Sequence, residues 1–179
     1  MRLFTAILFN EEIKDHLTEA IQKLKKQSAK GNFTFRDNLH LTLVFLGEVG
    51  EDKVGAVKAA MDQVHGEPFR LAILGFGKFR KNGGDIHWAG AEKSEALLSL
   101  REQLAAELEK EGFSLEDRAY SPHLTLGRQV RLTAPGEMSY GPLELARPEM
   151  KVSKLSLMKS ERIDGKLVYT EIYKRNLGT

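Results

Sequence analysis

Hydrophobic residues recur along the chain with two different periods. In residues 13–24 they return every three or four positions, which is the period of an amphipathic helix. Two further stripes of this kind occupy residues 54–64 and 97–108, and Asn10 and Ser94 stand where they can cap a first turn. Because glycine commonly follows the last turn of a helix, we expect glycines to end these three helices. They are Gly31, Gly66 and Gly112.

Short runs rich in β-forming residues separate the helical stripes. We predict strands at residues 3–9, 33–35, 39–47, 69–79, 85–91, 123–130, 152–158 and 166–173. Asn-Gly-Gly at residues 82–84 can supply the positive φ angles of a turn between two of these strands. The Pro- and Gly-rich segment 133–150 is interpreted as a loop. The chain therefore mixes helices and strands, as an α+β protein does.

The tetrapeptide His-Leu-Thr-Leu occurs twice, at residues 40–43 and 123–126. Each copy follows the same series of features, namely an amphipathic helix, a glycine, a short aromatic-led strand and a polar turn. This pattern predicts a duplicated α+β unit. We expect two lobes within one domain of residues 1–179, with the two copies in comparable places on either side of a cleft.

Composition and charge limit the classes of protein that this sequence can represent. Hydrophobic residues make up 41% and charged residues 29% of the chain, which argues against disorder. The formal net charge is +2, too small by itself to indicate a nucleic-acid partner. The absence of cysteine excludes disulfides, thiolate nucleophiles and cysteine-ligated zinc. No apolar run approaches the roughly 18 residues of a membrane span, so we expect no membrane contacts. We also expect the protein to be cytoplasmic and monomeric.

Each copy of the repeated motif has one polar and one apolar face, because side chains alternate along a strand. His40 and Thr42 share a face, as do His123 and Thr125. Since the pKa of an unperturbed histidine is about 6.5, one imidazole can act as general acid while the other acts as general base. An in-line displacement at phosphorus needs such a pair, together with hydroxyl donors for the phosphate oxygens. Arg128 can add a bidentate phosphate contact.

The symmetry of the repeat leaves open which histidine is the acid and which is the base. A metal site is the alternative to acid–base catalysis, since two histidines and a carboxylate can bind zinc. Neither motif contains an acidic residue, and Asp37 and Asp117 fall in turns, where such residues commonly have local roles. We therefore expect no metal and no cofactor. The other histidines are interpreted as solvated or structural, and they are His16, His65 and His87.

The two His-x-Thr motifs, in the segments HLTLVFLG and SPHLTLGR, resemble those of the 2H phosphoesterase superfamily. The opening RLFTAI and the ending LSLMKSERIDGKLVYTEI are similar to its bacterial and archaeal branch, the RNA 2',3'-cyclic phosphodiesterases, also called 2'-5' RNA ligases. The resemblance covers essentially the whole chain. It implies a bilobal α+β fold with antiparallel sheets lining a central cleft and helices on the outside.

The resemblance also implies an enzymatic activity and the residues that perform it. The reaction is the metal-independent hydrolysis of an RNA 2',3'-cyclic phosphate end, or of a cyclic nucleotide, to a 2'-phosphomonoester. By position, His40 matches the proton donor to the leaving 3'-oxygen, and His123 matches the proton acceptor that activates water. Phe45 matches an aromatic residue that stacks on the terminal base, although strict alternation puts Phe45 on the leucine face unless a bulge intervenes. The phosphate-binding residues are matched by Thr42, Thr125 and Arg128.

Two other functions fit the same residues. A protein that binds phosphorylated RNA ends without turnover would use basic side chains near the cleft. Candidates for that role are Arg36, Arg118, Arg128 and Arg131. A 2'-5' RNA ligase acting on tRNA halves would catalyse the reverse reaction with the acid and base exchanged.

Overall fold

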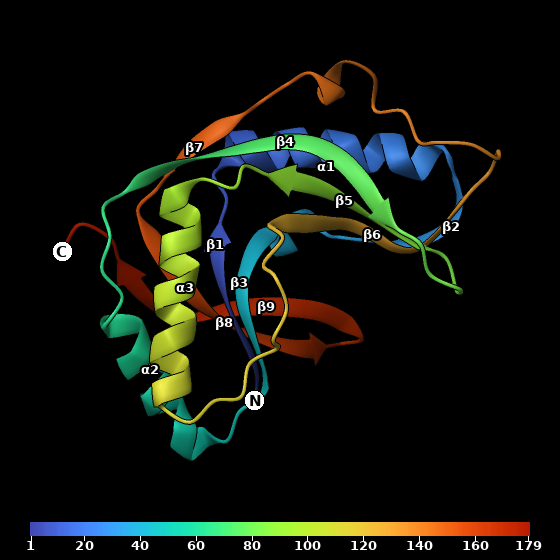
Figure 1. Ribbon diagram of the computed structural model, residues 1–179. Coiled ribbons are helices and arrows are strands. Elements are labelled where there is room, and N and C mark those ends of the chain that lie inside the picture. Colours follow the sequence, from blue (N-terminus) through green and yellow to red (C-terminus); the bar gives the residue numbers. More distant parts are fainter.

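The computed structural model describes residues 1–179, which form two antiparallel sheets with helices around them (Figure 1). The first sheet has the strand order β3-β1-β8-β9, and the second has the order β2-β6-β5-β4-β7. The strands are β1 (Arg2–Leu8), β2 (Ser28–Phe33), β3 (His40–Glu48), β4 (Phe69–Phe79), β5 (Asp85–Ala91), β6 (His123–Leu132), β7 (Glu149–Val152), β8 (Lys154–Ile163) and β9 (Lys166–Asn176). Every strand pairing is antiparallel, so the expected α+β fold is confirmed.

Three helices lie outside the sheets, and they are α1 (Glu11–Lys26), α2 (Val54–Asp62) and α3 (Glu95–Lys110). Helix α1 packs on β2 and β6 of the second sheet, whereas α2 packs on α3 and on β9 of the first. The side chains of Asn10 and Ser94 accept hydrogen bonds from the amides of Ile13 and Leu97, at 3.0 and 3.2 Å. These contacts are the predicted N-caps. Short 3₁₀ turns are η1 (Arg36–Asn38), η2 (Glu51–Lys53) and η3 (Gly141–Glu144).

The buried core is dominated by a cluster of 35 side chains drawn from both sheets and all three helices. The predicted apolar stripes are confirmed, because the buried faces of α1 and α3 consist of the expected residues. These are Ile13, Leu17, Ala20, Ile21 and Leu24 in α1, and Leu97, Leu100, Leu104 and Leu108 in α3. All four leucines of the two His-Leu-Thr-Leu motifs are also in this core. The apolar face of each motif therefore anchors its strand.

Several predicted boundaries are wrong, each for a local reason. Helix α1 ends at Lys26 rather than at Gly31, because the Ser28 hydroxyl bonds to the Leu24 carbonyl at 2.6 Å and the chain then enters β2. The strand predicted at residues 33–35 thus begins earlier and ends at Phe33. Helix α2 stops at Asp62, four residues before Gly66. In contrast, Gly112 follows α3 with a φ of +88°, as its position predicts.

The turn between β4 and β5 needs one positive φ angle rather than three. Only Gly84 has such an angle, at +123°, and a Cβ atom there would lie 2.6 Å from the Gln129 backbone. Glycine is therefore required at this position by both conformation and space. The strand predicted at residues 152–158 is divided between β7 and β8, and the predicted loop 133–150 contains η3 and the first residues of β7.

Candidate active site

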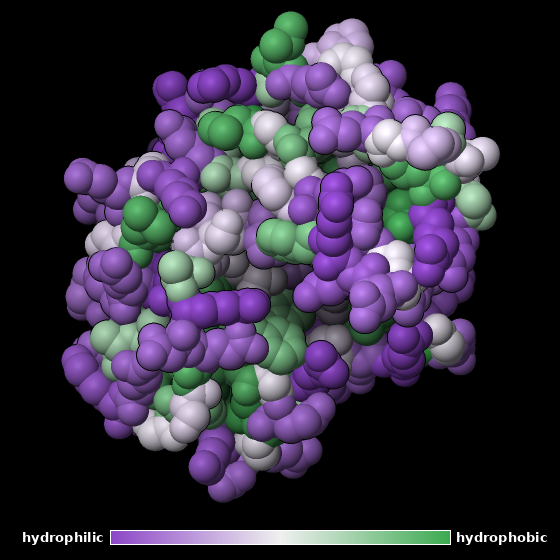
Figure 2. Space-filling model, turned by 45° about the vertical axis from the view of Figure 1, so that its right-hand side comes forward, coloured by the Kyte–Doolittle hydropathy of each residue, from purple (hydrophilic) through white to green (hydrophobic).

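A cleft of about 2170 Å³ opens between the two sheets, and both repeated motifs line it. Figure 2 looks toward this side of the molecule, which is hollowed near its centre. His40 and Thr42 enter the cleft from β3 of the first sheet, and His123 and Thr125 enter it from β6 of the second. The structure thus brings together the two polar pairs that the sequence places 83 residues apart.

Both ring nitrogens of His40 have hydrogen-bond partners, namely the Asn38 carbonyl and the Thr42 hydroxyl. Its Nδ1 lies 2.7 Å from the Asn38 carbonyl oxygen, which can only accept, so this nitrogen carries the proton in the neutral ring. Nε2 then accepts from the Thr42 hydroxyl at 2.9 Å. The Asn38 side chain, 8% exposed, donates to the Leu167 carbonyl of β9 at 2.8 Å. The ring is therefore fixed in orientation and in tautomer.

Two aromatic rings enclose His40. The Phe4 ring lies 4.8 Å from the imidazole centre, and the Tyr169 ring meets it edge-on at 5.1 Å. Burial lowers the pKa of His40, and the hydrogen bond to the Asn38 carbonyl opposes this effect only in part. The neutral imidazole is accordingly favoured while no anion is present.

His123 has the same backbone contact in more open surroundings. Its Nδ1 lies 2.7 Å from the Ser121 carbonyl oxygen, again two residues earlier in the chain. Phe79 meets the imidazole edge-on at 5.2 Å and is 39% exposed, and Trp88 lies at 6.2 Å. No protein group bonds to its Nε2, so this nitrogen is left for a ligand in the cleft.

Matching irregularities follow the two motifs. In β3, Leu43 is passed over in the pairing with β1, since Thr42 faces Ala6 and Val44 faces Thr5. In β6, Leu126 is passed over in the same way in the pairing with β5. Each bulge turns two successive residues toward the core and returns the next one to the cleft face.

The residue five positions after each histidine consequently lines the cleft. In the first arm this residue is Phe45, 48% exposed, with the Arg2 guanidinium 5.2 Å from its ring centre. In the second arm it is Arg128, whose Nη2 lies 3.5 Å from the Thr125 hydroxyl. The bulge that Phe45 would need in order to leave the leucine face is therefore present.

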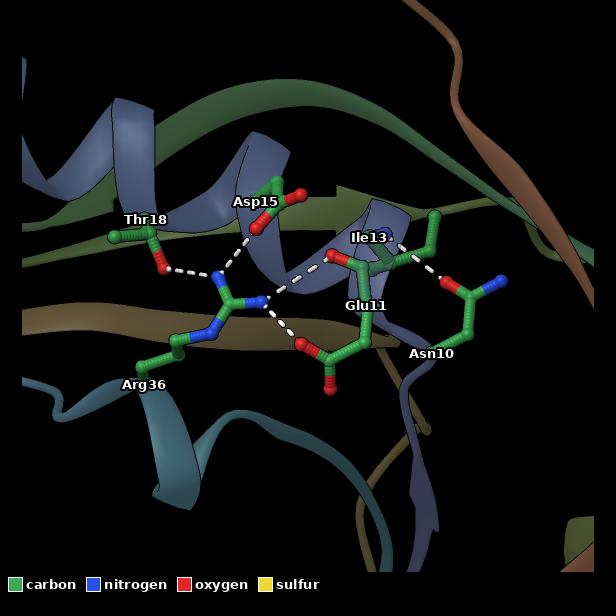
Figure 3. Close-up of polar contacts among 6 residues, drawn as sticks. All are labelled: Asn10, Glu11, Ile13, Asp15, Thr18 and Arg36. Atoms are coloured by element: carbon green, nitrogen blue, oxygen red, sulfur yellow. Dashed lines mark hydrogen bonds and ion pairs between the residues drawn. The ribbon is translucent and has the colours of Figure 1, made fainter.

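Arg36 does not belong to the cleft, contrary to its proposed role as an RNA contact. Its guanidinium points at α1, where it pairs with Glu11 at 2.6 Å and with Asp15 at 2.7 Å (Figure 3). Its charge is thus compensated, and the contact ties η1 to α1 just before His40. Arg131 is also outside the cleft and donates to the Asn82 carbonyl, whereas Arg118 lines the cleft beside Glu116.

Two tyrosines lie at the site that were not predicted from the sequence. Tyr120 donates from its hydroxyl to the Thr42 carbonyl at 2.8 Å and so connects the two arms. Tyr169 packs on His40, and burial raises the pKa of its phenol while the charges of Arg128 and Arg2 oppose the rise. Only Tyr120 had a local signal, namely its place three residues before the second histidine.

No group of three or more His, Cys, Asp or Glu side chains comes together as metal ligands would. The two catalytic candidates are accompanied by hydroxyls, a guanidinium and aromatic rings instead. No helix has the length and apolar character needed to cross a membrane.

Comparisons with known proteins identify the family of this chain. Residues 13–164 match the family model described as the 2'-5' RNA ligase superfamily. A protein of Thermotoga maritima named RNA 2',3'-cyclic phosphodiesterase is 36% identical over 165 residues, which are 88% of each chain. A protein of Methanothermobacter thermautotrophicus with the same name is 34% identical over 178 residues, which are 96% of each chain.

Solved structures give the same result for the fold. A crystal structure of a Thermus thermophilus protein superposes with a TM-score of 0.81 at 30% identity, covering 98% of this chain and 97% of the other. Escherichia coli LigT, crystallised with 3'-AMP, has a TM-score of 0.81 at 24% identity over 99% and 98% of the chains, and at that identity shows the fold alone. The chain belongs to the 2'-5' RNA ligase superfamily and, within it, to the family of these RNA 2',3'-cyclic phosphodiesterases.

Proposed function

We propose that this protein hydrolyses RNA 2',3'-cyclic phosphate ends to 2'-phosphomonoesters, using His40 and His123 as its acid and base and no metal ion. The observation that carries the proposal is the shared tautomer. Each Nδ1 is bound to the carbonyl two residues earlier, so Nε2 is the nitrogen of each cleft-lining ring that can exchange a proton with a substrate. Two imidazoles prepared alike on opposite sheets are suited to an in-line reaction, which needs one on either side of phosphorus. The names of the relatives support the substrate class.

The reaction uses one water molecule and conserves both protons. Nε2 of His123 takes a proton from water as the water oxygen bonds to phosphorus. The bond from phosphorus to the 3'-oxygen breaks on the opposite side, and Nε2 of His40 gives its proton to that oxygen. The product is a 2'-phosphomonoester with a free 3'-hydroxyl, and the proton gained by His123 returns to His40 through solvent. Each histidine contributes a factor of about 10²–10⁴ to the rate.

The hydroxyls and Arg128 serve the phosphate. Thr42 and Thr125 stand beside the two histidines and can donate to the equatorial oxygens, where charge accumulates in the transition state. Arg128, within 3.5 Å of Thr125, adds a charged donor on the second arm. Phe45, exposed beyond the first bulge, offers a ring on which the terminal base stacks.

The lowered pKa of His40 makes its role as acid dependent on the substrate. In the free protein the neutral form is favoured. A phosphate anion beside Nε2 favours the protonated imidazole and raises its pKa again. His40 is thus charged when the substrate arrives, and the Thr42 hydroxyl is released from Nε2 to the phosphate.

The test is the conversion of 2',3'-cyclic AMP followed by mass spectrometry and by separation of the 2' and 3' monophosphates. We expect a mass gain of one water, 2'-AMP as product, and full activity in the presence of EDTA. Loss of activity in EDTA would contradict the metal-free mechanism. Binding of a cyclic-phosphate end without any mass change would identify an RNA-end binding protein. Joining of a 5'-hydroxyl RNA to the cyclic end as the dominant reaction would identify a ligase.

A further inference from the structure

The positive charge of this protein is concentrated around the cleft. Eleven of its 27 Lys and Arg residues line the cleft, but only three of its 25 Asp and Glu residues do so. The chain as a whole has a net charge of only +2, so the surface outside the cleft is net acidic. A charge distribution this uneven favours a ligand with more negative charge than the single charge of a cyclic phosphate.

Four of these cations, all exposed, stand on two hairpins. The β4–β5 turn has Arg80 and Lys81, and the β8–β9 turn has Arg162 and Lys166. In Figure 1 both turns project from the same side of the molecule. All four side chains line the cleft, and none of them pairs with a carboxylate. Three other cations of the cleft have ion-pair partners, since Lys78 pairs with Asp85, Arg118 with Glu116 and Lys159 with Glu161.

Uncompensated charges of one sign raise the free energy of the folded chain, and a polyanion that binds between them removes this repulsion. Exposed aromatic side chains accompany the cations along the cleft. Phe79 lies at the base of the β4–β5 turn beside His123, and Phe35 is 59% exposed on the cleft wall. Cations that follow a backbone, interleaved with rings on which bases stack, are the pattern of a site for single-stranded nucleic acid.

We propose that the tips of the β4–β5 and β8–β9 hairpins bind the backbone phosphates of a single-stranded RNA that leads into the cleft, and that the protein thereby prefers cyclic ends on oligonucleotides to cyclic mononucleotides. The inference rests on the proposed function and deepens it. The histidines engage the terminal phosphate, and Arg80, Lys81, Arg162 and Lys166 engage phosphates on its 5' side.

The experiment compares kcat/KM for 2',3'-cyclic AMP with that for oligoadenylates of two, four and six nucleotides with the same cyclic end. We expect kcat/KM to rise with length, mainly through KM, by about tenfold or more for the longest. In the variant R80Q/K81Q/R162Q/K166Q the ratio of hexanucleotide to mononucleotide should fall toward one. The slope of log kcat/KM against log salt for the hexanucleotide should become shallower by about 2–3, since each single-strand phosphate contact contributes roughly 0.7.

The matched control is K93Q/K151Q, which removes two exposed, unpaired lysines outside the cleft and should keep the length ratio of the parent. The inference is overturned if the ratio is the same in the tip variant as in the parent, or if the control lowers it equally. Competition by duplex RNA or heparin as strong as that by single-stranded RNA would overturn the assignment of the ligand.

Failure of the proposed function itself gives a different result. If 2',3'-cyclic AMP and the oligonucleotides all resist hydrolysis, the acid–base mechanism is wrong, whereas the hairpin site is still decided by binding. Fluorescence anisotropy with a labelled hexaadenylate ending in a 2'-phosphate then serves as the measurement. Weaker binding to the tip variant than to K93Q/K151Q upholds the hairpin site, and equal binding overturns it.

Discussion

The two His-Leu-Thr-Leu arms have the same strand geometry and different surroundings. In both, Nδ1 of the histidine lies 2.7 Å from the carbonyl two residues before it. In both, the pairing passes over the second leucine of the motif. The backbone of each arm thus prepares an Nε2, a hydroxyl and a residue five positions later for the same cleft.

The differences lie in what surrounds this common frame. Phe4, which covers His40, is 3% exposed, whereas Phe79 beside His123 is 39% exposed. The residue five positions after the histidine is the aromatic Phe45 in the first arm and the cationic Arg128 in the second. The repeated motif therefore has the same geometry in both arms, whereas the enclosing side chains differ, as the proposed acid and base roles require. Four predictions test this division.

The largest expected effect is the loss of either histidine. His40→Ala and His123→Ala should each lower kcat/KM for 2',3'-cyclic AMP by about 10²–10⁴-fold. A cyclic substrate with sulfur in place of the 3'-oxygen separates the roles, because a thiolate leaves without being protonated. We expect this substrate to restore much of the activity of His40→Ala and little of that of His123→Ala.

The opposite rescue pattern would exchange the acid and the base between the arms. Equal rescue of both variants would show that the different enclosure of the rings does not set their roles. Circular dichroism of each variant serves as the control for folding.

The second largest effect is expected from the loss of Arg128, the charged residue five positions after His123. Arg128→Ala is expected to lower kcat/KM by roughly 10- to 150-fold, since a charged hydrogen bond contributes about 1.5–3 kcal/mol. The loss should be the same for all four bases, because the contact is to phosphate. Arg128→Lys should recover only part of the activity, as it keeps the charge without the planar fork. A loss that varies with the base would place Arg128 at the base instead.

Phe45→Ala should have a smaller effect that depends on the presence of a base. Stacking contributes about 1–3 kcal/mol per base, and the half-exposed ring of Phe45 points to the lower end, a factor of about 5–10 in KM. Ribose 2',3'-cyclic phosphate, which has no base, is the matched control and should be hydrolysed equally by parent and variant. An equal loss with this control would mean that Phe45 supports the strand rather than the substrate.

The strands that frame the site could be predicted from sequence where the local pattern is sufficient. The strands at residues 69–79 and 85–91 were predicted to the residue, because dense β-formers are bounded by a turn of Asn and Gly. The predicted end of α1 at Gly31 is wrong, because the Ser28 hydroxyl donates to the Leu24 carbonyl and the helix ends at Lys26.

The pairing of the two motifs could also be predicted, because the repeat is visible in the sequence. The bulges at Leu43 and Leu126 could not, since they depend on the registers of the partner strands β1 and β5. Nor could the enclosure of His40 by Tyr169, which comes from the far end of the chain. Sequence periodicity gives the face of a residue within one strand, whereas burial of an imidazole depends on strands that are distant in sequence.

The smallest expected effect concerns stability as the pH falls. Burial is the largest cause that lowers the pKa of His40, and the same is true of His16 and His87. The unfolded chain takes up these protons near the ordinary value of 6.5, whereas the folded chain resists them until a lower pH. The stabilising contribution is therefore complete above the unfolded pKa and is lost as the pH falls through the folded one. Each proton adds at most about 1.4 kcal/mol per pH unit to the slope of the free energy of unfolding against pH.

His40→Gln should flatten this slope, as measured by urea unfolding between about pH 5 and pH 7. His16→Gln is the matched control, because His16 also has a lowered pKa but lies outside the cleft. It should flatten the slope in the same direction and leave hydrolysis intact. If His40→Gln keeps the full slope of the parent while His16→Gln reduces it, then the rings of Phe4 and Tyr169 do not hold His40 neutral. The asymmetry between the two arms would then have to arise from the bound substrate alone.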